Sequence, residues 1–115
     1  MYDFDKTRRL LHKADYDDVF SQACKIVNAD YIVLHRTNTL GFARLGLALS
    51  KKVIPKACQR NRLKRLIRES FRTQTLPPVD LIFLAKKAVA QKENGVINQG
   101  LEDTWNKLIV FYAEH

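Results

Sequence analysis

Apolar residues recur at helical spacing in three segments of the chain. We predict helices over residues 15–26, over 56–72 and from about residue 96 onward, because one helical turn takes 3.6 residues. Aspartates favour the start of the first helix, and Pro55 suits the start of the second. The apolar residues that set the period are Val19, Phe20 and Ala23 in the first segment, Leu63, Leu66, Ile67 and Phe71 in the second, and Leu101, Trp105, Leu108, Ile109 and Tyr112 in the third.

Strands are predicted in the segments between these helices. Residues 31–36 are rich in β-forming residues, and residues 44–50 alternate between two faces after a polar turn at 37–42, which indicates a hairpin. Residues 81–85 form a short apolar run after Pro77 and Pro78 and are predicted to be a buried strand, whereas Asn94-Gly95 marks a turn. The predicted order is α, β, β, α, β, α.

The two faces of the 44–50 strand differ in size. Leu45, Leu47 and Leu49 share one face and should point into the core. The other face is small and carries Arg44, Gly46, Ala48 and Ser50. Such a face suits either an extended ligand lying close to the sheet or a tightly packed helix. For the 31–36 strand the open face stays undecided, because a one-residue slip exchanges its two faces.

The charge of the chain is concentrated in one segment. The 115 residues, enough for one domain, carry a net charge of +8, and residues 51–72 alone account for all of it. This segregation favours a polyanionic partner, nucleic acid first and an acidic membrane surface second, over a merely solvated helix.

The sequence has neither a membrane span nor a signal peptide, which points to the cytoplasm. The longest apolar run has six residues, at 108–113, whereas a membrane span takes about 20, and the N-terminal segment lacks the apolar core of a signal peptide. We therefore expect a cytoplasmic protein without a membrane partner, in which Cys24 and Cys58 are reduced. Both cysteines are expected to pack on amphipathic helices.

The residues that could carry catalysis do not converge in the sequence. His12, His35 and His115 fall in separate elements or at the terminus, and His35 on a strand is better interpreted as a structural or surface residue than as a general base. The two cysteines have no nearby histidine pair, so they do not match a zinc site. The glycines match neither a Walker motif nor a dinucleotide fingerprint. The chain alone is a poor candidate for a catalyst.

Nucleic-acid binding has positive support. Cations cover more than half the circumference of the 56–72 helix, and arginine offers a planar fork that fits phosphate oxygens. Tyr16 and Phe20 are four residues apart and share a helical face. If this face borders the small strand face, rings and cations surround a groove suited to single-stranded RNA. For Phe20 alone, packing in the core is the stronger interpretation.

The basic segment resembles the signature of the protein subunit of bacterial ribonuclease P. The residues that carry the resemblance are Ser50-Lys51-Lys52, Ala57 and the run from Arg60-Asn61-Arg62 to Arg72, and the similarity extends from about residue 4 to 112. The resemblance implies a single RNA-binding α+β domain over 1–115. Its fold would be a two-layer α/β sandwich similar to the second domain of ribosomal protein S5. The basic helix would lie in a left-handed βαβ crossover, contrary to the usual handedness.

The resemblance also implies a function and its residues. The family binds the catalytic RNA of ribonuclease P and the 5′ leader of precursor tRNA, so that the complex removes the leader as an endoribonuclease. The RNA and its Mg²⁺ carry the chemistry, and the protein, expected as a monomer in a 1:1 complex, supplies no catalytic residue and binds no metal tightly. The catalytic RNA would be contacted by Lys51, Lys52, Arg60, Asn61, Arg62, Lys64, Arg65 and Arg68, and the leader by a cleft of Tyr16, Phe20, Arg44, Gly46, Ala48 and Ser50.

Two details complete these expectations. The strand of the cleft that can hold an aromatic residue in the family has Ile32, Leu34 and Arg36 on the matching face, so we expect weaker stacking there. Arg62 and Arg65 lie off the apolar stripe of their helix, so neither is expected to be needed for folding. A general RNA-binding module and a stand-alone nuclease are the alternative functions.

Overall fold

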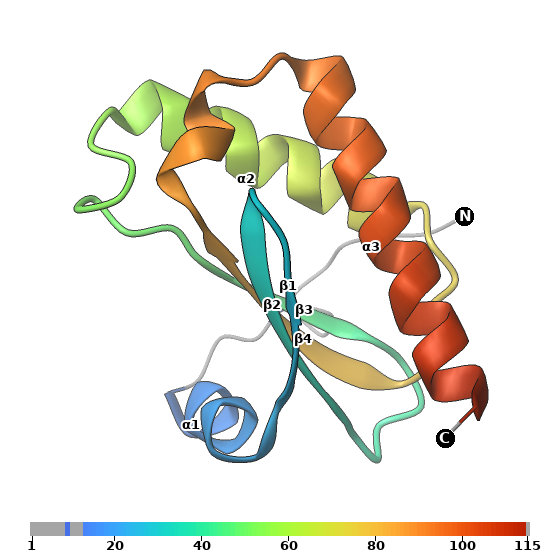
Figure 1. Cartoon of the computed structure of the whole chain (residues 1–115). Helices are drawn as coiled ribbons and strands as arrows, with labels where there is room; N and C mark the ends of the chain where they lie inside the picture. The colour runs from blue at the N-terminus through green and yellow to red at the C-terminus, as the bar shows by residue number, and fades with distance from the viewer. Residues whose placement is uncertain (1–8, 10–12, 115) are drawn as a thin grey trace.

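The computed structural model describes residue 9 and residues 13–114, which form three α-helices, four strands and one short 3₁₀ helix (Figure 1). Tertiary pairing decides which short segments become strands, whereas the long apolar periods decide the helices. The elements in chain order are α1 (Lys13–Gln22), β1 (Cys24–Val27), β2 (Tyr31–Thr37), β3 (Arg44–Ala48), α2 (Ala57–Arg72), β4 (Val79–Ala85), η2 (Lys87–Gln91) and α3 (Asn94–Glu114).

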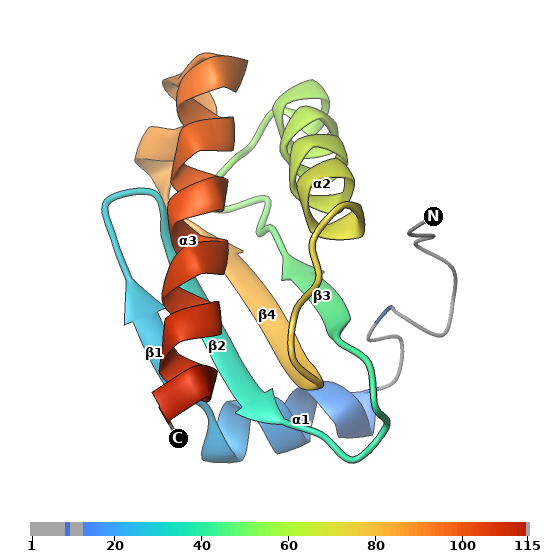
Figure 2. The same ribbon diagram turned by 90° about the vertical axis from the view of Figure 1, so that its right-hand side faces the viewer.

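The strands form one mixed sheet in the order β1-β2-β4-β3. β2 is antiparallel to both β1 and β4, whereas β3 and β4 are parallel neighbours joined through α2. Seen from the side of α2 and α3 with both parallel strands pointing up, β4 lies to the left of β3 (Figure 2). The crossover is therefore left-handed, as the family resemblance predicted and against the usual preference.

Helices cover the two faces of the sheet unequally. α2 and α3 lie side by side on one face, where they make the α/β sandwich, and α1 crosses the other face (Figure 1). The main core lies between the sheet and the pair of helices, and residues such as Phe83, Ile67 and Trp105 are fully buried there. A small second cluster of Val19, Leu34 and Ile82 lies under α1.

Three predictions about local structure were wrong. The first helix ends at Gln22, and residues 24–27 form β1, because this segment pairs with β2 through a turn in which the Asn28 side chain accepts hydrogen bonds from two backbone N–H groups. β2 and β3 do not form a hairpin, because β4 lies between them. Asn94 and Gly95 begin α3 and do not form a turn.

Other predictions were confirmed. The basic helix begins one residue later than predicted, and the strand at 81–85 begins two residues earlier. Leu45, Leu47 and Leu49 pack into the main core. In β2, Tyr31 and Val33 face the main core and Leu34 faces α1, which resolves the open question of its faces. No helix in the described part of the chain combines the length and apolarity that a bilayer crossing requires.

Candidate nucleic-acid interface

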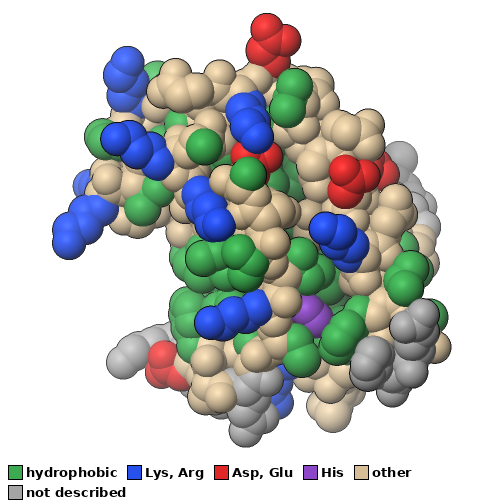
Figure 3. Space-filling view, viewed as in Figure 1, with side chains coloured by type: hydrophobic (Ala, Val, Ile, Leu, Met, Phe, Trp, Pro, Cys, Tyr) green, Lys and Arg blue, Asp and Glu red, His purple; other side chains and the backbone are tan. Residues whose placement is uncertain are grey.

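α2 presents its cations because its apolar residues face the core. Leu63, Ile67 and Phe71 are fully buried, so the remaining circumference of the helix points away from the sheet or along its edge. Leu66 is only half-buried. Lys51, Lys52 and Lys56 are exposed where the chain enters this helix. Figure 3 shows Lys and Arg side chains gathered over the N-terminal end of α2.

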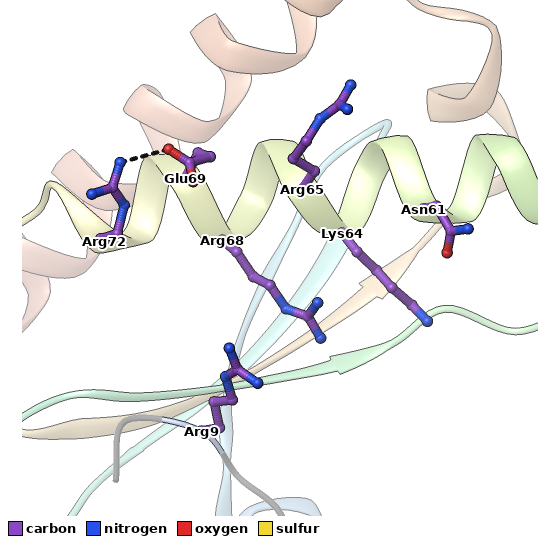
Figure 4. A pocket seen from close by; sticks show the side chains of 7 residues that line it. All are labelled: Arg9, Asn61, Lys64, Arg65, Arg68, Glu69 and Arg72. Carbon is purple, nitrogen blue, oxygen red and sulfur yellow. Dashed lines mark hydrogen bonds and ion pairs between the residues drawn. The ribbon is translucent and has the colours of Figure 1, made fainter. Parts of the chain in front are cut away.

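A basic groove of about 480 Å³ runs along one side of α2. Its floor lies toward β3, where Arg9 forms a parallel bridge with Leu45 at the sheet edge. In Figure 4, Asn61, Lys64 and Arg68 point to the same side of the helix as Arg9, whereas Arg65 points to the other. The described residues that line the groove are Arg9, Asn61, Lys64, Arg65, Arg68, Glu69 and Arg72.

The groove has an excess of positive charge. Glu69 forms an ion pair with Arg72, at 2.6 Å between Oε2 and Nη2, so its carboxylate is paired with the arginine at the C-terminal end of the helix. Burial lowers the pKa of Arg68, the charge of Arg9 lowers it further, and Tyr16 acts in the opposite direction. A guanidinium remains protonated under such shifts, so Arg9 and Arg68 are two like charges placed next to each other.

The two arginines of the Arg60-Asn61-Arg62 motif are bound to the protein's own backbone. Arg60 donates from Nη1 to the carbonyl oxygens of Ile54 and Pro55, both at 2.8 Å. Arg62 reaches the connection between η2 and α3, where it donates to the carbonyls of Ala90 (3.0 Å) and Lys92 (3.1 Å) and to Asn94 Oδ1 (2.7 Å). The helical wheel did not predict these bonds, which tie α2 to the η2–α3 connection, so the expectation that folding does not need Arg62 stays a prediction for the Arg62→Ala variant to test. Asn61 is exposed.

Part of the small strand face that was predicted to line the cleft is covered by α1. A Cβ at Gly46 would lie 2.7 Å from the hydroxyl oxygen of Tyr16, so α1 packs directly on this part of β3, as the helix-packing alternative predicted. Ala48 packs against the same small cluster, and Ser50 lies beyond it at the exposed end. Phe20 is 51% exposed, so the alternative that it packs in the core is wrong and its ring is accessible to a partner.

Arg44 lies at the far end of the same strand face. It donates to Asp80 from Nε (2.9 Å) and from Nη2 (2.7 Å), and Asn38 donates to the same carboxylate at 2.9 Å. This bidentate ion pair is mostly buried. Its two residues lie opposite each other in the parallel pairing of β3 and β4. The structure therefore gives Arg44 a partner within the sheet, while Tyr16 interacts with Arg68 of α2.

Comparisons with known proteins agree with this arrangement. The family described as Ribonuclease P matches residues 4–109. The ribonuclease P protein component of Legionella pneumophila (strain Lens) is 55% identical over 114 residues, 99% of this chain and 100% of the relative. That of Aliivibrio fischeri is 41% identical, covering 93% of each chain.

The chain belongs to the family of ribonuclease P protein components. This membership places its role in the maturation of tRNA 5′ ends. Solved structures of family members have the same fold. The Staphylococcus aureus protein superimposes with a TM-score of 0.82 at 27% identity, covering 90% of this chain and 99% of the other. The Thermotoga maritima protein gives 0.77 at 25% identity, covering 86% and 96%.

The ribonuclease P family signature did not reveal every residue of the interface. Arg9 lies in the basic groove, yet nothing in the local pattern marks it, because it joins the groove only through its pairing beside Leu45. His35 is buried and lies 2.7 Å from the Tyr112 hydroxyl through Nδ1, which confirms a structural role. Cys24 and Cys58 are both exposed thiols, so their assignment to helical packing was wrong.

The described residues include no group of three or more His, Cys, Asp or Glu side chains that could hold a metal ion. The groove instead offers guanidinium, ammonium and amide groups. These groups donate hydrogen bonds to phosphate oxygens and do not coordinate cations through carboxylates.

Proposed function

We propose that this ribonuclease P protein binds the catalytic RNA of the enzyme and the 5′ leader of precursor tRNA, and so promotes removal of the leader. The observation that carries the proposal is the basic groove of α2, whose Arg68 interacts with Tyr16 of α1, the helix that also carries the exposed Phe20. The groove is suited to phosphates, and an exposed ring is suited to unpaired bases. The groove and the exposed ring thus support binding of two RNA strands.

The groove serves binding and charge neutralisation. Lys64 and Arg65 are held on a rigid helix whose other side is fixed in the core, so they meet phosphates with little loss of conformational freedom. Neutralised phosphates allow two RNA segments to approach, which lowers the Mg²⁺ concentration that the RNA needs for its active fold. Mg²⁺, bound by the RNA, supplies the activation of water for phosphodiester hydrolysis.

The cleft serves recognition of the leader. Phe20 offers an exposed ring face, and Tyr16 fills the space above Gly46. Stacking is tolerant of sequence because every base has a π face, which suits leaders of differing sequence. We propose one protein for each catalytic RNA in the cytoplasm.

Reconstituted cleavage tests this function. The protein is added to a bacterial ribonuclease P RNA and a precursor tRNA at low Mg²⁺, and release of the leader is measured over time. We expect cleavage to be strongly stimulated by the wild-type protein and by Lys25→Ala, and stimulated less by Lys64→Ala. Lys25 is a matched control because it lies on β1, at the opposite edge of the sheet from β3. Absence of stimulation by the wild-type protein would contradict the proposal.

A preference test separates this function from a general RNA-binding module. The complex should bind precursor tRNA that carries a leader more tightly than mature tRNA, and the difference should be smaller for the complex made with Phe20→Ala. Equal binding of both RNAs by the wild-type complex would favour the general module.

A further inference from the structure

Arg60 comes from the side of α2 that packs on the core. It precedes Leu63 and Ile67 by three and seven residues, the spacing of one helical face, and both of these side chains are fully buried. Arg60 is not among the described residues that line the basic groove, whereas Lys64 and Arg65 are. The guanidinium of Arg60 therefore lies in different surroundings from the cations of the groove.

This guanidinium is bound to the connection that leads from β3 into α2. Arg60 Nη1 donates to the carbonyl oxygens of Ile54 and Pro55, both at 2.8 Å. Because one nitrogen holds two carbonyls, the guanidinium is turned toward the connection, and the carbonyl dipoles offset part of its charge. A phosphate at the same nitrogen would have to displace both carbonyls, which would leave the partly buried oxygen of Ile54 without this donor.

The same connection carries two exposed cations, Lys51 and Lys52. Their turn is closed by Ser50, whose carbonyl accepts from the N–H of Ile54 at 2.9 Å and whose hydroxyl accepts from the N–H of Lys52 at 3.0 Å. Ile54, at the end of the turn, is fully buried. The turn is thus fixed to the core by Ile54 and to α2 by Arg60, and Figure 1 shows this connection beside the N-terminal end of α2.

We propose that Arg60 is a positioning residue of the RNA-binding surface, which holds the turn of Lys51 and Lys52 against α2 so that both lysines meet phosphates of the catalytic RNA. This inference rests on the proposed function, because it assumes that the catalytic RNA lies on this surface. The lysines bind the phosphates, and Arg60 acts through them. A turn that is held in place before binding loses less conformational freedom when RNA docks, so a loosened turn lowers the affinity.

Replacement of Arg60 by citrulline separates its hydrogen bonds from its charge. Citrulline keeps the length of the side chain and one NH₂ group that can donate to two carbonyls, but it is neutral. Cys58 offers a junction for the synthesis, because residues 1–57 can be joined at this cysteine to a synthetic peptide of residues 58–115. The same peptide carries the matched control Arg65→citrulline, which removes an exposed charge of the same helix. Each chain is checked by thermal unfolding.

The affinity for a bacterial ribonuclease P RNA is measured over a range of salt concentrations. We expect Arg65→citrulline to bind about tenfold more weakly and to lower the salt slope by about 0.7 to 0.9, the value for one phosphate. Arg60→citrulline should stay within about threefold of the wild type with the same slope, because no phosphate contact is lost. Equal losses of affinity and slope in the two citrulline variants would place a phosphate on Arg60 and overturn the proposal.

The alanine variant measures the action of Arg60 through the lysines. Arg60→Ala should bind the RNA about fivefold more weakly, because the turn must be ordered on binding. Hydrogen exchange should quicken at the amides of Lys52 and Ile54, which close the turn. In a chain that already carries Lys51→Ala and Lys52→Ala, the addition of Arg60→Ala should weaken binding by less than about twofold, because the cations that it positions are gone.

These outcomes separate the positioning role from the function on which it rests. The same loss from Arg60→Ala with and without the two lysines would show that Arg60 acts independently of the turn and would overturn the role. Wild-type affinity of Arg60→Ala would overturn it as well, and both results leave the proposed function intact. Absence of binding by the wild-type protein would contradict the proposed function itself, and it is measured before any variant is compared.

Discussion

The two faces of the sheet bury different amounts of apolar side chain. On the face of α2 and α3, large side chains from both helices and from β2 and β4 are excluded from water. On the face of α1, the buried cluster consists of Val19, Leu34 and Ile82, and the neighbouring Phe20 is half-exposed. Free energy from apolar burial scales with the area removed from water, so the first face contributes most of the stability.

This difference separates folding from binding. An element with few buried contacts opens at low free-energy cost, and its exposed groups are available to a partner. In the proposed function, α1 would adjust to a leader without loss of the main core, while α2 holds its cations in fixed positions because it packs in that core. Four substitutions test this division, in order of decreasing effect.

The packed face is tested at Trp105. This side chain is fully buried, its ring lies 5.4 Å from that of Phe83, and its Nε1 donates to Ser70 Oγ at 2.7 Å. We expect Trp105→Ala to lower the free energy of unfolding by about 3 to 5 kcal/mol, measured by urea denaturation. Val110→Ala, at an exposed site of the same helix, should change it by less than about 0.5 kcal/mol. Similar effects of the two changes would contradict the proposed packing of α3.

The second test separates cations that hold the fold from cations that face RNA. Arg62→Ala should lower the free energy of unfolding by about 2 kcal/mol, because it leaves partly buried carbonyls of the η2–α3 connection without their donor. Arg65→Ala removes an exposed side chain of the same helix and should leave the stability unchanged within about 0.5 kcal/mol while weakening RNA binding. Wild-type stability of Arg62→Ala would show that its hydrogen bonds are dispensable.

The contrast between these arginines marks the limit of prediction from sequence. The bounds of α2 were predicted within one residue, because its apolar stripe repeats over four turns and depends on local spacing alone. The acceptors of Arg62 lie 28 to 32 residues away in the chain, so no helical wheel could place them.

Strand pairing shows the same limit. The alternation of large and small side chains identified β3 and its buried face, but it could not show which strand pairs with β3. In the structure β4 lies between β3 and β2. The residues 24–27 were assigned to a helix because the apolar spacing of α1 continues to Ala23, and only pairing with β2 makes them a strand. Arg9 joined the site in the same way, through a bridge to the edge of β3. The left-handed crossover came from the family resemblance, since local patterns have no handedness.

The face of α1 is tested at Phe20. We expect Phe20→Ala to weaken binding of leader-bearing precursor tRNA to the complex about fivefold, near 1 kcal/mol, the lower end of the range for loss of one stacked base. Mature tRNA should bind as before, and the free energy of unfolding should change by less than about 0.5 kcal/mol, since half of the ring is already exposed. Val27→Ala, also exposed but on β1, is the control. A large loss of stability in Phe20→Ala would place Phe20 in the core after all.

The smallest expected effect uses pH to distinguish the two faces. His35 lies on the packed face, 1% exposed, and burial lowers the pKa of its imidazole below the ordinary 6.5. Burial also raises the pKa of Tyr112 to about 12, so its hydroxyl keeps its proton and can donate to Nδ1 of a neutral imidazole. The folded protein therefore favours neutral His35, and the unfolded chain binds the proton more readily.

The sign of the pH dependence follows from this difference. The contribution of His35 to stability is complete above pH 6.5 and is lost as the pH falls below 6.5 toward the lower pKa of the folded state. Between pH 7.5 and 5.5, we expect the free energy of unfolding of the wild type to fall by up to about 1 kcal/mol relative to His35→Gln, which cannot take up the proton. Hydrogen exchange over the same range should quicken in α3, which packs on His35, before it changes in α1. Parallel unfolding curves for the two proteins would show that protonation of His35 does not destabilise the packed face, and faster exchange in α1 first would reverse the assignment of the two faces.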